Sequence, residues 1–284
     1  MKFTKFHALG NDFLIVDLDE VVLLEAPGDM ARRICDRHTG VGADGLLLIS
    51  VKDRVRGDVS FRVFNADGSE AEISGNGLRC AAAYLYSQQK IDPTVVRFQT
   101  ATGERTCELV RRTEDGFLMK IEMGVPRFAS PDIPFDDGAV HQRIIDYPLM
   151  INAETYPATV VSLGNPHCDI FIDRFPGRFE WHQLGREIES HPFFPNRTNV
   201  EFIRIRSREE IEVLFWERGV GETLSSGSGA CAAAVASILK GLVDHRVTVR
   251  ASMGSLLVEW LGETENVYQT GPAEFAFVGS FLFK

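Results

Sequence analysis

The chain has 284 residues, of which 44% are hydrophobic and 25% charged, and its length permits two domains of ordinary size. These fractions are close to globular averages and disfavour disordered, fibrous and membrane-spanning classes. The net charge is −10 with no basic run longer than two residues, so we expect no nucleic-acid partner.

Short strands dominate the elements predicted by periodicity, and turn residues separate them at β-rich spacing. In chain order the predicted strands are 13–19, 45–50, 58–64, 95–100, 106–112, 117–123, 158–163, 168–172, 199–205, 211–217, 246–251, 255–260 and 275–283. Helical patterns cover 28–38, 75–89, 181–190 and 227–240. We therefore predict an α+β fold, with a few helices wrapped by sheet.

Cysteine and histidine usage argues against several kinds of site. The five cysteines (35, 80, 107, 168 and 231) form no CxxC pair, which favours a reducing cytoplasm over a disulfide scaffold. The seven histidines include no HxH or HExxH pair, so no metal is implied. No segment approaches 18 apolar residues and the N-terminus has no signal-peptide core, so no membrane partner is expected.

A weak internal repeat organises the chain. Leu9-Gly10-Asn11 recurs 154 residues later as Leu163-Gly164-Asn165, and Ser74-Gly-Asn-Gly recurs 152 residues later as Ser226-Gly-Ser-Gly. Each serine motif precedes a Cys-Ala-Ala-Ala helix. The repeat predicts two similar tandem domains, 1–124 and 125–270, related by a pseudo-twofold axis, with a ligand between them.

The two serine motifs are candidate anion sites. Each lies where a loop becomes a helix, so Ser74 and Ser226 are expected N-caps, and the first backbone N–H groups face a carboxylate or phosphate. A merely well-capped helix is the alternative for either motif alone. The polar strings 65–70 and 217–222 flank the motifs and offer donors and acceptors suited to the two ends of an amino acid, although a solvated turn remains the alternative.

Other motifs fail on context. Gly40-Val-Gly-Ala-Asp-Gly45 follows a helix and precedes a strand, the reverse of a dinucleotide-binding fingerprint. Neither Ser74 nor Ser226 lies in a GxSxG elbow, which argues against an α/β-hydrolase. Among the histidines His167 is the one we associate with the site, against a core or surface role.

Five ordered motifs make the chain resemble the diaminopimelate epimerase family, which are cofactor-independent amino-acid epimerases, over almost its whole length. The motifs are 5–13, 64–70, 74–80, 164–167 and 217–223 with 227–232. The resemblance implies that each domain is a curled, mostly antiparallel sheet around a central helix, with strands of 271–284 completing the first domain. It also implies interconversion of LL- and meso-diaminopimelate by two-base α-proton transfer, in lysine and peptidoglycan precursor biosynthesis.

Site residues follow from the same resemblance by motif position. Substrate contacts are expected at Asn11, Asn65, Gly75, Asn76, Asn165, Asn199, Glu217, Arg218, Gly227 and Ser228. His167 and Glu217 match a pair that tunes the catalytic bases, and Tyr268 matches a dimer-interface tyrosine, so a homodimer is expected. A family Gln contact is missing because its position holds Gly45. The resemblance implies no cofactor and no metal, and its distal contacts favour diaminopimelate over amino acids with one charged end.

The chain departs from the family at the centre of the mechanism. Epimerases of this family use two cysteines, one on each face of the α-carbon, and those positions hold Ser74 and Ser226 here. A serine hydroxyl titrates several units above a thiol, at about 1.36 kcal/mol per unit, and a helix dipole contributes at most about 2 kcal/mol. Serines should therefore bind substrate and deprotonate it badly, unless His167 or Glu217 serves as base.

Three interpretations stay open at this point. The chain is a diaminopimelate epimerase with both cysteines replaced by serine, a natural relative with altered amino-acid chemistry, or a non-catalytic amino-acid binding protein. We favour the epimerase function, impaired by the serines, because the contacts for two amino-acid ends are almost intact.

Overall fold

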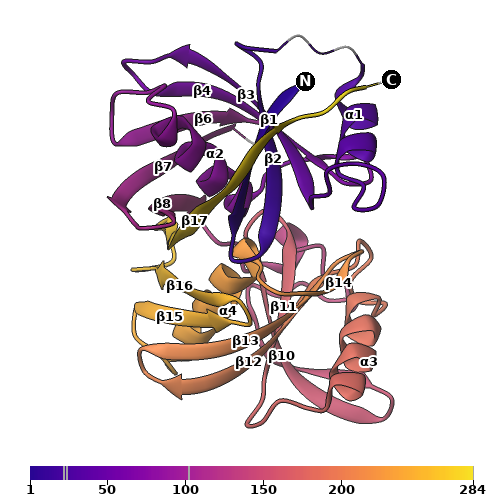
Figure 1. The fold of residues 1–284 in the computed structure, drawn as a ribbon. Coiled ribbons are helices and arrows are strands. Elements are labelled where there is room, and N and C mark those ends of the chain that lie inside the picture. The colour runs from indigo at the N-terminus through magenta and orange to yellow at the C-terminus, as the bar shows by residue number, and fades with distance from the viewer. Residues whose placement is uncertain (22, 24, 102, 284) are drawn as a thin grey trace. The chain divides into compact units, whose positions relative to one another are not determined.

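The computed structural model describes residues 1–21, 23, 25–101 and 103–283, and its contacts divide the chain into two units. Unit 1 comprises Met1–Glu122 with Thr270–Lys284, and unit 2 comprises Met123–Gln269. The C-terminal segment of the chain thus belongs to the same unit as the N-terminal segment. Each unit is a sheet-dominated body with its own helices (Figure 1).

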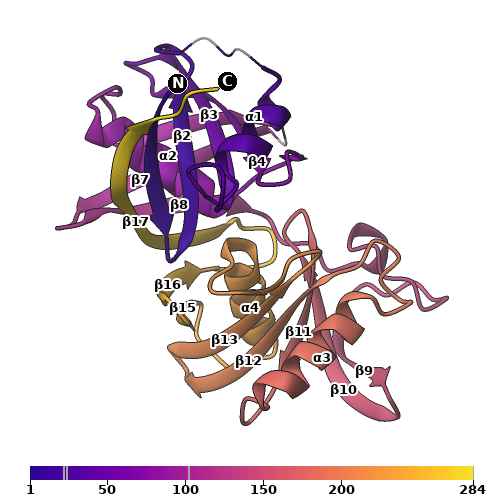
Figure 2. The ribbon, with the colours of Figure 1, turned by 45° about the vertical axis from the view of Figure 1, so that its right-hand side comes forward.

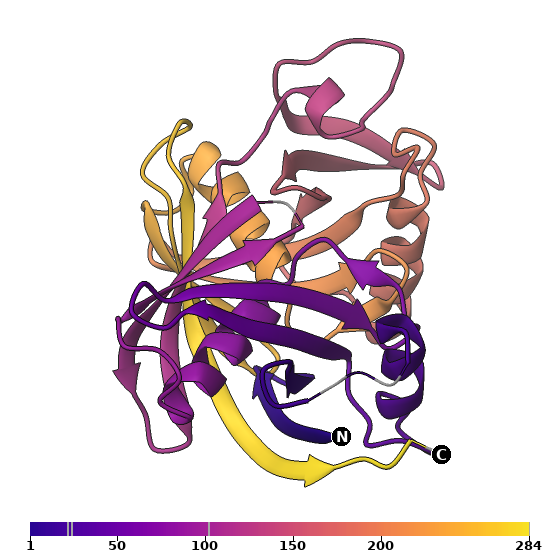
Figure 3. The same cartoon turned by 90° about the horizontal axis from the view of Figure 1, so that it is seen from above.

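Unit 1 is a sheet that closes on itself. Its strands are β1 (Lys2–Ala8), β2 (Asn11–Asp17), β3 (Gly45–Asp53), β4 (Asp58–Asn65), β5 (Glu70–Ala71), β6 (Val95–Thr100), β7 (Gly103–Arg112), β8 (Gly116–Gly124) and most of β17 (Val267–Ser280). Pairing runs β17–β1–β2–β3–β4–β6–β7–β8, and β8 pairs with β17. The β2–β3 and β4–β6 pairs are parallel. Figure 3 shows β17 in yellow beside the N-terminal strand.

Helix α2 (Gly75–Ser87) is the central helix of unit 1, and it contacts β1, β2, β3 and β7. Every residue from Asn76 to Tyr86 is buried. Small side chains at 80–83 let strands approach the helix closely, and a helix enclosed on all sides has no polar face to expose. The shorter helix α1 (Pro27–Ile34) packs Met30, Ala31 and Ile34 into a core with β2 and β3.

Unit 2 repeats this plan. Its strands are β9 (Ile144–Ile151), β10 (Glu154–Ser162), β11 (Pro166–Phe171), β12 (Asn199–Ser207), β13 (Glu210–Glu217), β14 (Gly221–Thr223), β15 (Arg246–Ala251) and β16 (Gly254–Glu259), with a 3₁₀ turn at Ser130–Asp132. They pair in the order β9–β10–β11–β12–β13–β15–β16, and β14 pairs with β13. The β11–β12 and β13–β15 pairs are parallel, as their counterparts in unit 1 are.

Two helices cover opposite faces of the unit 2 sheet. Helix α4 (Gly227–Leu239) contacts β10 to β13, and all its residues from Gly229 to Ser237 are buried. Helix α3 (Arg178–Glu189) lies along β12 and β13 (Figure 2). It is amphipathic, and its Trp181 ring packs on Phe202 and Trp216 of these strands. Since side chains alternate along a strand, Glu201 and Phe215 face α4 instead.

The predicted fold class is confirmed: two similar α+β units each have a mostly antiparallel sheet and a central helix after a serine motif. The prediction missed β1, β5, β9 and β14. Strand β9 and the start of β10 were not predicted, because Pro148 and Pro157 pair across this hairpin and proline is a poor strand signal. None of the helices in the described residues is long and apolar enough to span a bilayer.

The predicted helix 28–38 was wrong at its end, because α1 stops at Ile34. The Asp36 carboxylate accepts the backbone N–H groups of His38 at 2.8 Å and Thr39 at 2.6 Å. Such an Asx turn offers the backbone an alternative to helix, and it ends the helical segment.

The α3 face gives a first test of packing. A Cβ atom at Gly185 would lie 2.8 Å from the Trp216 ring, which is held by an Nε1–H bond to Glu189 at 2.8 Å. Gly185→Ala should lower the free energy of unfolding by about 1–3 kcal/mol through overpacking. Urea unfolding followed by tryptophan fluorescence measures this, since Trp181, Trp216 and Trp260 all lie in unit 2.

Gly262→Ala is the matched control, because a Cβ atom there meets nothing within 4 Å. It should change stability by less than about 0.5 kcal/mol. Equal losses in both variants would contradict the packing argument.

Candidate active site

Both predicted N-caps are confirmed. The Ser74 Oγ accepts the N–H of Gly77 at 3.0 Å, and the Ser226 Oγ accepts the N–H of Gly229 at 3.2 Å. Both serines have extended backbones before helical first turns. The N–H groups of the first two residues of each helix, 75–76 in α2 and 227–228 in α4, have no acceptor within the helix, and a helix N-terminus favours anions. Each unit therefore carries an equivalent N-capped helix end.

In unit 1 a directed series of hydrogen bonds orients two predicted contacts. The buried Arg79 guanidinium donates to Asn76 Oδ1 at 2.5 Å, and Asn76 Nδ2 donates to Asn11 Oδ1 at 3.0 Å. Asn11 Nδ2 then donates to Asp44 at 2.8 Å. Each amide uses one N–H in the series, so the second N–H of Asn11 and Asn76 can donate to a ligand.

The series ends in a charged cluster. Arg37 donates to Asp12 at 2.7 Å and to Asp44 at 2.8 Å, and Lys5 lies 2.7 Å from Asp12. Burial alone would raise the pKa of Asp12, but Arg37 and Lys5 outweigh it and lower that pKa. Asp12 is thus held as a carboxylate, and Arg37 ties it to Asp44 at the acceptor end of the series.

Asn65 and Gly45, two further positions of unit 1, do not take part in this hydrogen-bonded series with their side-chain positions. Asn65 is exposed, and its amide donates to Ser69 Oγ at 2.9 Å, apart from the Asn11–Asn76 pair. At Gly45 a Cβ atom would lie 2.9 Å from the Phe64 carbonyl oxygen. A side chain at position 45 therefore does not fit without a backbone shift. Gly75 is the first residue of α2, where its missing side chain bares the helix end.

In unit 2 a second series reaches the first turn of α4. His167 Nε2 lies 3.0 Å from Asn165 Oδ1, and Asn165 Nδ2 donates to Ser228 Oγ at 3.4 Å. Asn199 donates to the Pro166 carbonyl at 2.9 Å and accepts the Arg218 N–H at 3.0 Å. Asn199 thus fixes the backbone of two site segments with one N–H and its carbonyl oxygen, and its second N–H can donate to a ligand, as in Asn11 and Asn76.

The remaining predicted residues lie at the end of β13, at the start of α4 and in β17. Glu217 ends β13 and is half-buried, while Arg218 is exposed and donates to the Asn196 carbonyl at 3.1 Å. Gly227 is the first residue of α4. Tyr268 is half-buried in β17, away from these contacts in sequence.

Two buried acids, Asp169 and Glu201, lie beside the predicted site residue His167 and were not predicted from the sequence. They are partners in the parallel β11–β12 ladder and both are fully buried, and Glu201 Oε1 lies 2.8 Å from His167 Nδ1. Neither Asp169 oxygen, nor Glu201 Oε2, has a hydrogen-bond partner among the described residues. The available signal was a charged residue inside each of two apolar strands, two positions after His167 and after Asn199.

Burial dominates the electrostatics of this cluster. It lowers the pKa of His167 to about 3, with Glu217 opposing and Arg218 assisting the shift. It also raises the pKa of Asp169, which the neighbouring Glu201 raises further, and raises the pKa of Glu201, with a contribution from Glu217. Neutral forms of all three groups are therefore favoured.

The native cysteines do not replace the missing thiols. All five are buried, and none is in a disulfide. Burial raises the pKa of Cys80 to about 12, and Cys231 lies fully buried within α4 with Gln269 Nε2 3.3 Å from its sulfur. Neither can be a thiolate at the helix end. Nor do the described residues contain a group of three or more His, Cys, Asp or Glu side chains placed to hold a metal ion.

The family model for diaminopimelate epimerase matches residues 3–129 and 159–276. Relatives named diaminopimelate epimerase are 44% identical in Pelotomaculum thermopropionicum, over all of both chains, and 41% identical in Moorella thermoacetica, over 99% of both. The chain belongs to the diaminopimelate epimerase family.

Solved structures share the fold of this diaminopimelate epimerase family member. A probable proline racemase from Agrobacterium radiobacter has a TM-score of 0.72 at 16% identity, covering 100% of this chain and 93% of its own. A hydroxyproline epimerase from Agrobacterium vitis has a TM-score of 0.68 at 15% identity, covering 98% and 91%. At these identities the likeness concerns the fold alone.

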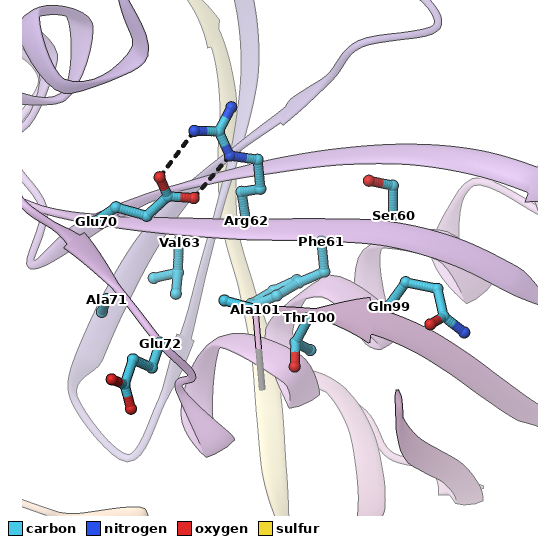
Figure 4. A pocket seen from close by; sticks show the side chains of 10 residues that line it. All are labelled: Ser60, Phe61, Arg62, Val63, Glu70, Ala71, Glu72, Gln99, Thr100 and Ala101. Carbon is cyan, nitrogen blue, oxygen red and sulfur yellow. Dashed lines mark hydrogen bonds and ion pairs between the residues drawn. The ribbon is translucent and has the colours of Figure 1, made fainter. Parts of the chain in front are cut away.

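Unit 1 has a hollow of ≈ 260 Å³ whose lining includes one residue of the family's motifs, Glu70. It opens between β4, β5 and β6, where Arg62 and Glu70 form two hydrogen bonds of 2.7 and 2.8 Å (Figure 4). Phe61, Glu72, Gln99 and Thr100 also line it. None of the predicted site residues of this epimerase family member does.

The buried acids of this epimerase family member give a pH-dependent prediction. Because its folded-state pKa is raised, Asp169 keeps a proton that the unfolded chain releases above about pH 4. The wild type therefore loses stability as pH rises from about 4 toward the folded-state pKa, by at most about 1.36 kcal/mol per pH unit for one proton. Asp169→Val should be the more stable protein, and its advantage in urea unfolding should be larger at pH 8.5 than at pH 5.5.

Asp173→Val is the control, since Asp173 is exposed just beyond β11. It should show no such growth of the difference with pH. A loss of stability in Asp169→Val, or a difference that is the same at both pH values, would contradict the assignment of Asp169 as a buried neutral acid.

Proposed function

We propose that this chain is built to interconvert LL- and meso-diaminopimelate by two-base transfer of the α-proton, and that its serines impair turnover. The family match and the full-length relatives support the reaction class. The observation that carries the proposal is the pair of N-capped helix ends with oriented amides beside each.

The substrate's charged ends suit the groups present. Backbone N–H groups at the starts of α2 and α4 favour a carboxylate, and the amides of Asn11 and Asn76 add donors. The Glu217 carboxylate and the Arg218 guanidinium suit the ammonium and carboxylate of a second amino-acid end. Asn65, exposed at the end of β4, is assigned to the same distal group.

The serines preserve binding geometry and remove the bases. A thiol at an N-cap gains from the helix dipole and from the N–H bond that the serine now accepts, which lowers its pKa toward neutrality. The serine hydroxyl starts several units higher, at about 1.36 kcal/mol per unit, so the same environment cannot ionise it. Positions 74 and 226 would serve opposite faces of the α-carbon.

A non-catalytic amino-acid binding protein is the second candidate function. The well-formed Ser74 and Ser226 caps favour it, because each hydroxyl already satisfies a backbone donor without any acid–base duty. The proposal also includes a homodimer through Tyr268, which follows from the family resemblance. It includes a cytoplasmic location, which follows from five cysteines without a disulfide.

Exchange of the α-hydrogen tests the proposal. The protein is incubated with LL- or meso-diaminopimelate in D₂O and the α-hydrogen signal is followed by NMR. We expect little exchange by the serine form, and a rise of roughly 10²- to 10⁴-fold in the Ser74→Cys/Ser226→Cys variant, the usual contribution of general acid–base catalysis.

Ser225→Cys is the matched control, because it places a thiol one residue from the cap of α4. It should leave exchange at the serine level. Rapid exchange by the serine form would contradict the impairment. A folded double cysteine variant without exchange would contradict the epimerase assignment, and calorimetric binding of another amino acid in preference to diaminopimelate would then support the binding protein.

A further inference from the structure

The buried cluster behind α4 connects three secondary-structure elements. His167 and Asp169 lie on β11, Glu201 lies opposite Asp169 on β12, and all three side chains are fully buried. Glu201 fits against the helix because residue 229 is a glycine: a Cβ atom there would lie 2.5 Å from Glu201 Oε1. The cluster therefore touches the same first turn that carries Ser226 and Ser228.

The hydrogen bonds of this cluster fix the direction of each donor. His167 Nε2 lies 3.0 Å from the carbonyl oxygen of the Asn165 amide, which only accepts, so Nε2 carries a hydrogen. The Asn165 Nδ2 group then donates to Ser228 Oγ. In a neutral imidazole the other nitrogen, Nδ1, is an acceptor. Its contact of 2.8 Å with Glu201 Oε1 therefore requires a hydrogen on the carboxyl.

The charges around the cluster favour this neutral arrangement over an ion pair. An imidazolium–carboxylate pair would place two charges where both side chains are fully buried, at a desolvation cost that the neutral pair avoids. Burial and then the Glu217 carboxylate disfavour ionisation of Glu201, and burial and Arg218 disfavour a charge on His167, where Glu217 acts in the opposite direction. Burial lowers the pKa of His167 to about 3, so the ring stays neutral at ordinary pH.

We propose that Glu201 is a positioning residue whose carboxyl is protonated in the folded protein and holds His167 as the Nε2–H tautomer, which in turn orients Asn165 toward Ser228. The tautomer stands on the hydrogen bonds of unit 2 alone. Its meaning for the reaction rests on the proposed function: His167 then offers no free lone pair toward Asn165 and is not the base that replaces a cysteine.

The tautomer is measurable without substrate. In protein labelled with ¹⁵N-histidine, long-range ¹H–¹⁵N correlation distinguishes a bare ring nitrogen from one that carries hydrogen, and loss of one set of signals in His167→Gln assigns the ring. We expect a bare Nδ1 and a protonated Nε2, unchanged from about pH 5 to about pH 9. A protonated Nδ1 with a bare Nε2, a doubly protonated ring, or a titration within that range would overturn the proposal.

Two variants separate positioning from packing. Glu201→Gln keeps a donor at the same place, so the Nε2–H signature should persist. Glu201→Met keeps the approximate volume without a donor, so the two tautomers should become mixed and the His167 signals should shift. An unchanged signature in a folded Glu201→Met variant would overturn the proposal, as would its loss in Glu201→Gln. If a variant does not fold, the wild-type spectrum still decides.

The spectrum is independent of the epimerase assignment. The expected tautomer in a protein that never exchanges the α-hydrogen would remove the proposed function and leave Glu201 as the residue that sets the tautomer. Exchange by the double cysteine variant, together with a doubly protonated His167, would support the proposed function and overturn the assignment of Glu201.

Discussion

One hydrogen bond, made once in each unit, organises the start of each central helix: a serine hydroxyl accepts the N–H of the third residue of the helix that follows it. The bond fixes the angle at which the loop enters each central helix, and the N–H groups of the first two helical residues have no acceptor within the helix. Because the strands enclose α2 and α4, these helix ends are held by the whole of each unit. The energy of one cap is only about 1 kcal/mol, so its importance here is geometric.

Buried ionisable groups position the amides around each cap. In unit 1 the series begins at Arg79 and ends at Asp44, and in unit 2 it begins at Glu201 and ends at Ser228. The two series differ in the charge of the buried group at which they begin, since Arg79 in unit 1 is a cation and Glu201 in unit 2 is a neutral acid. In both, the polar network is fixed before a ligand arrives, which lowers the entropy that binding must overcome.

The sequence predicted the features that are local in the chain. The Ser-Gly-x-Gly caps, the central helices and most strands follow from turn residues and periodicity. The end of α1 and strand β9 did not, because Asp36 and the pair Pro148–Pro157 act through contacts that periodicity does not encode. Asp169 and Glu201 were visible as charges in apolar strands, but their meaning depends on the strand face toward α4, which only the pairing register reveals.

The central claim is that the cap position stabilises an anion, so that a thiol there would be a base where the serine is not. The direct measurement is the pH dependence of iodoacetamide alkylation of Ser74→Cys, beside Ser87→Cys at the other end of α2 and the wild type, whose five cysteines are buried. We predict a midpoint below the ordinary thiol value of about 8.5 for Ser74→Cys and at or above it for Ser87→Cys. Equal midpoints for the two variants would contradict the account.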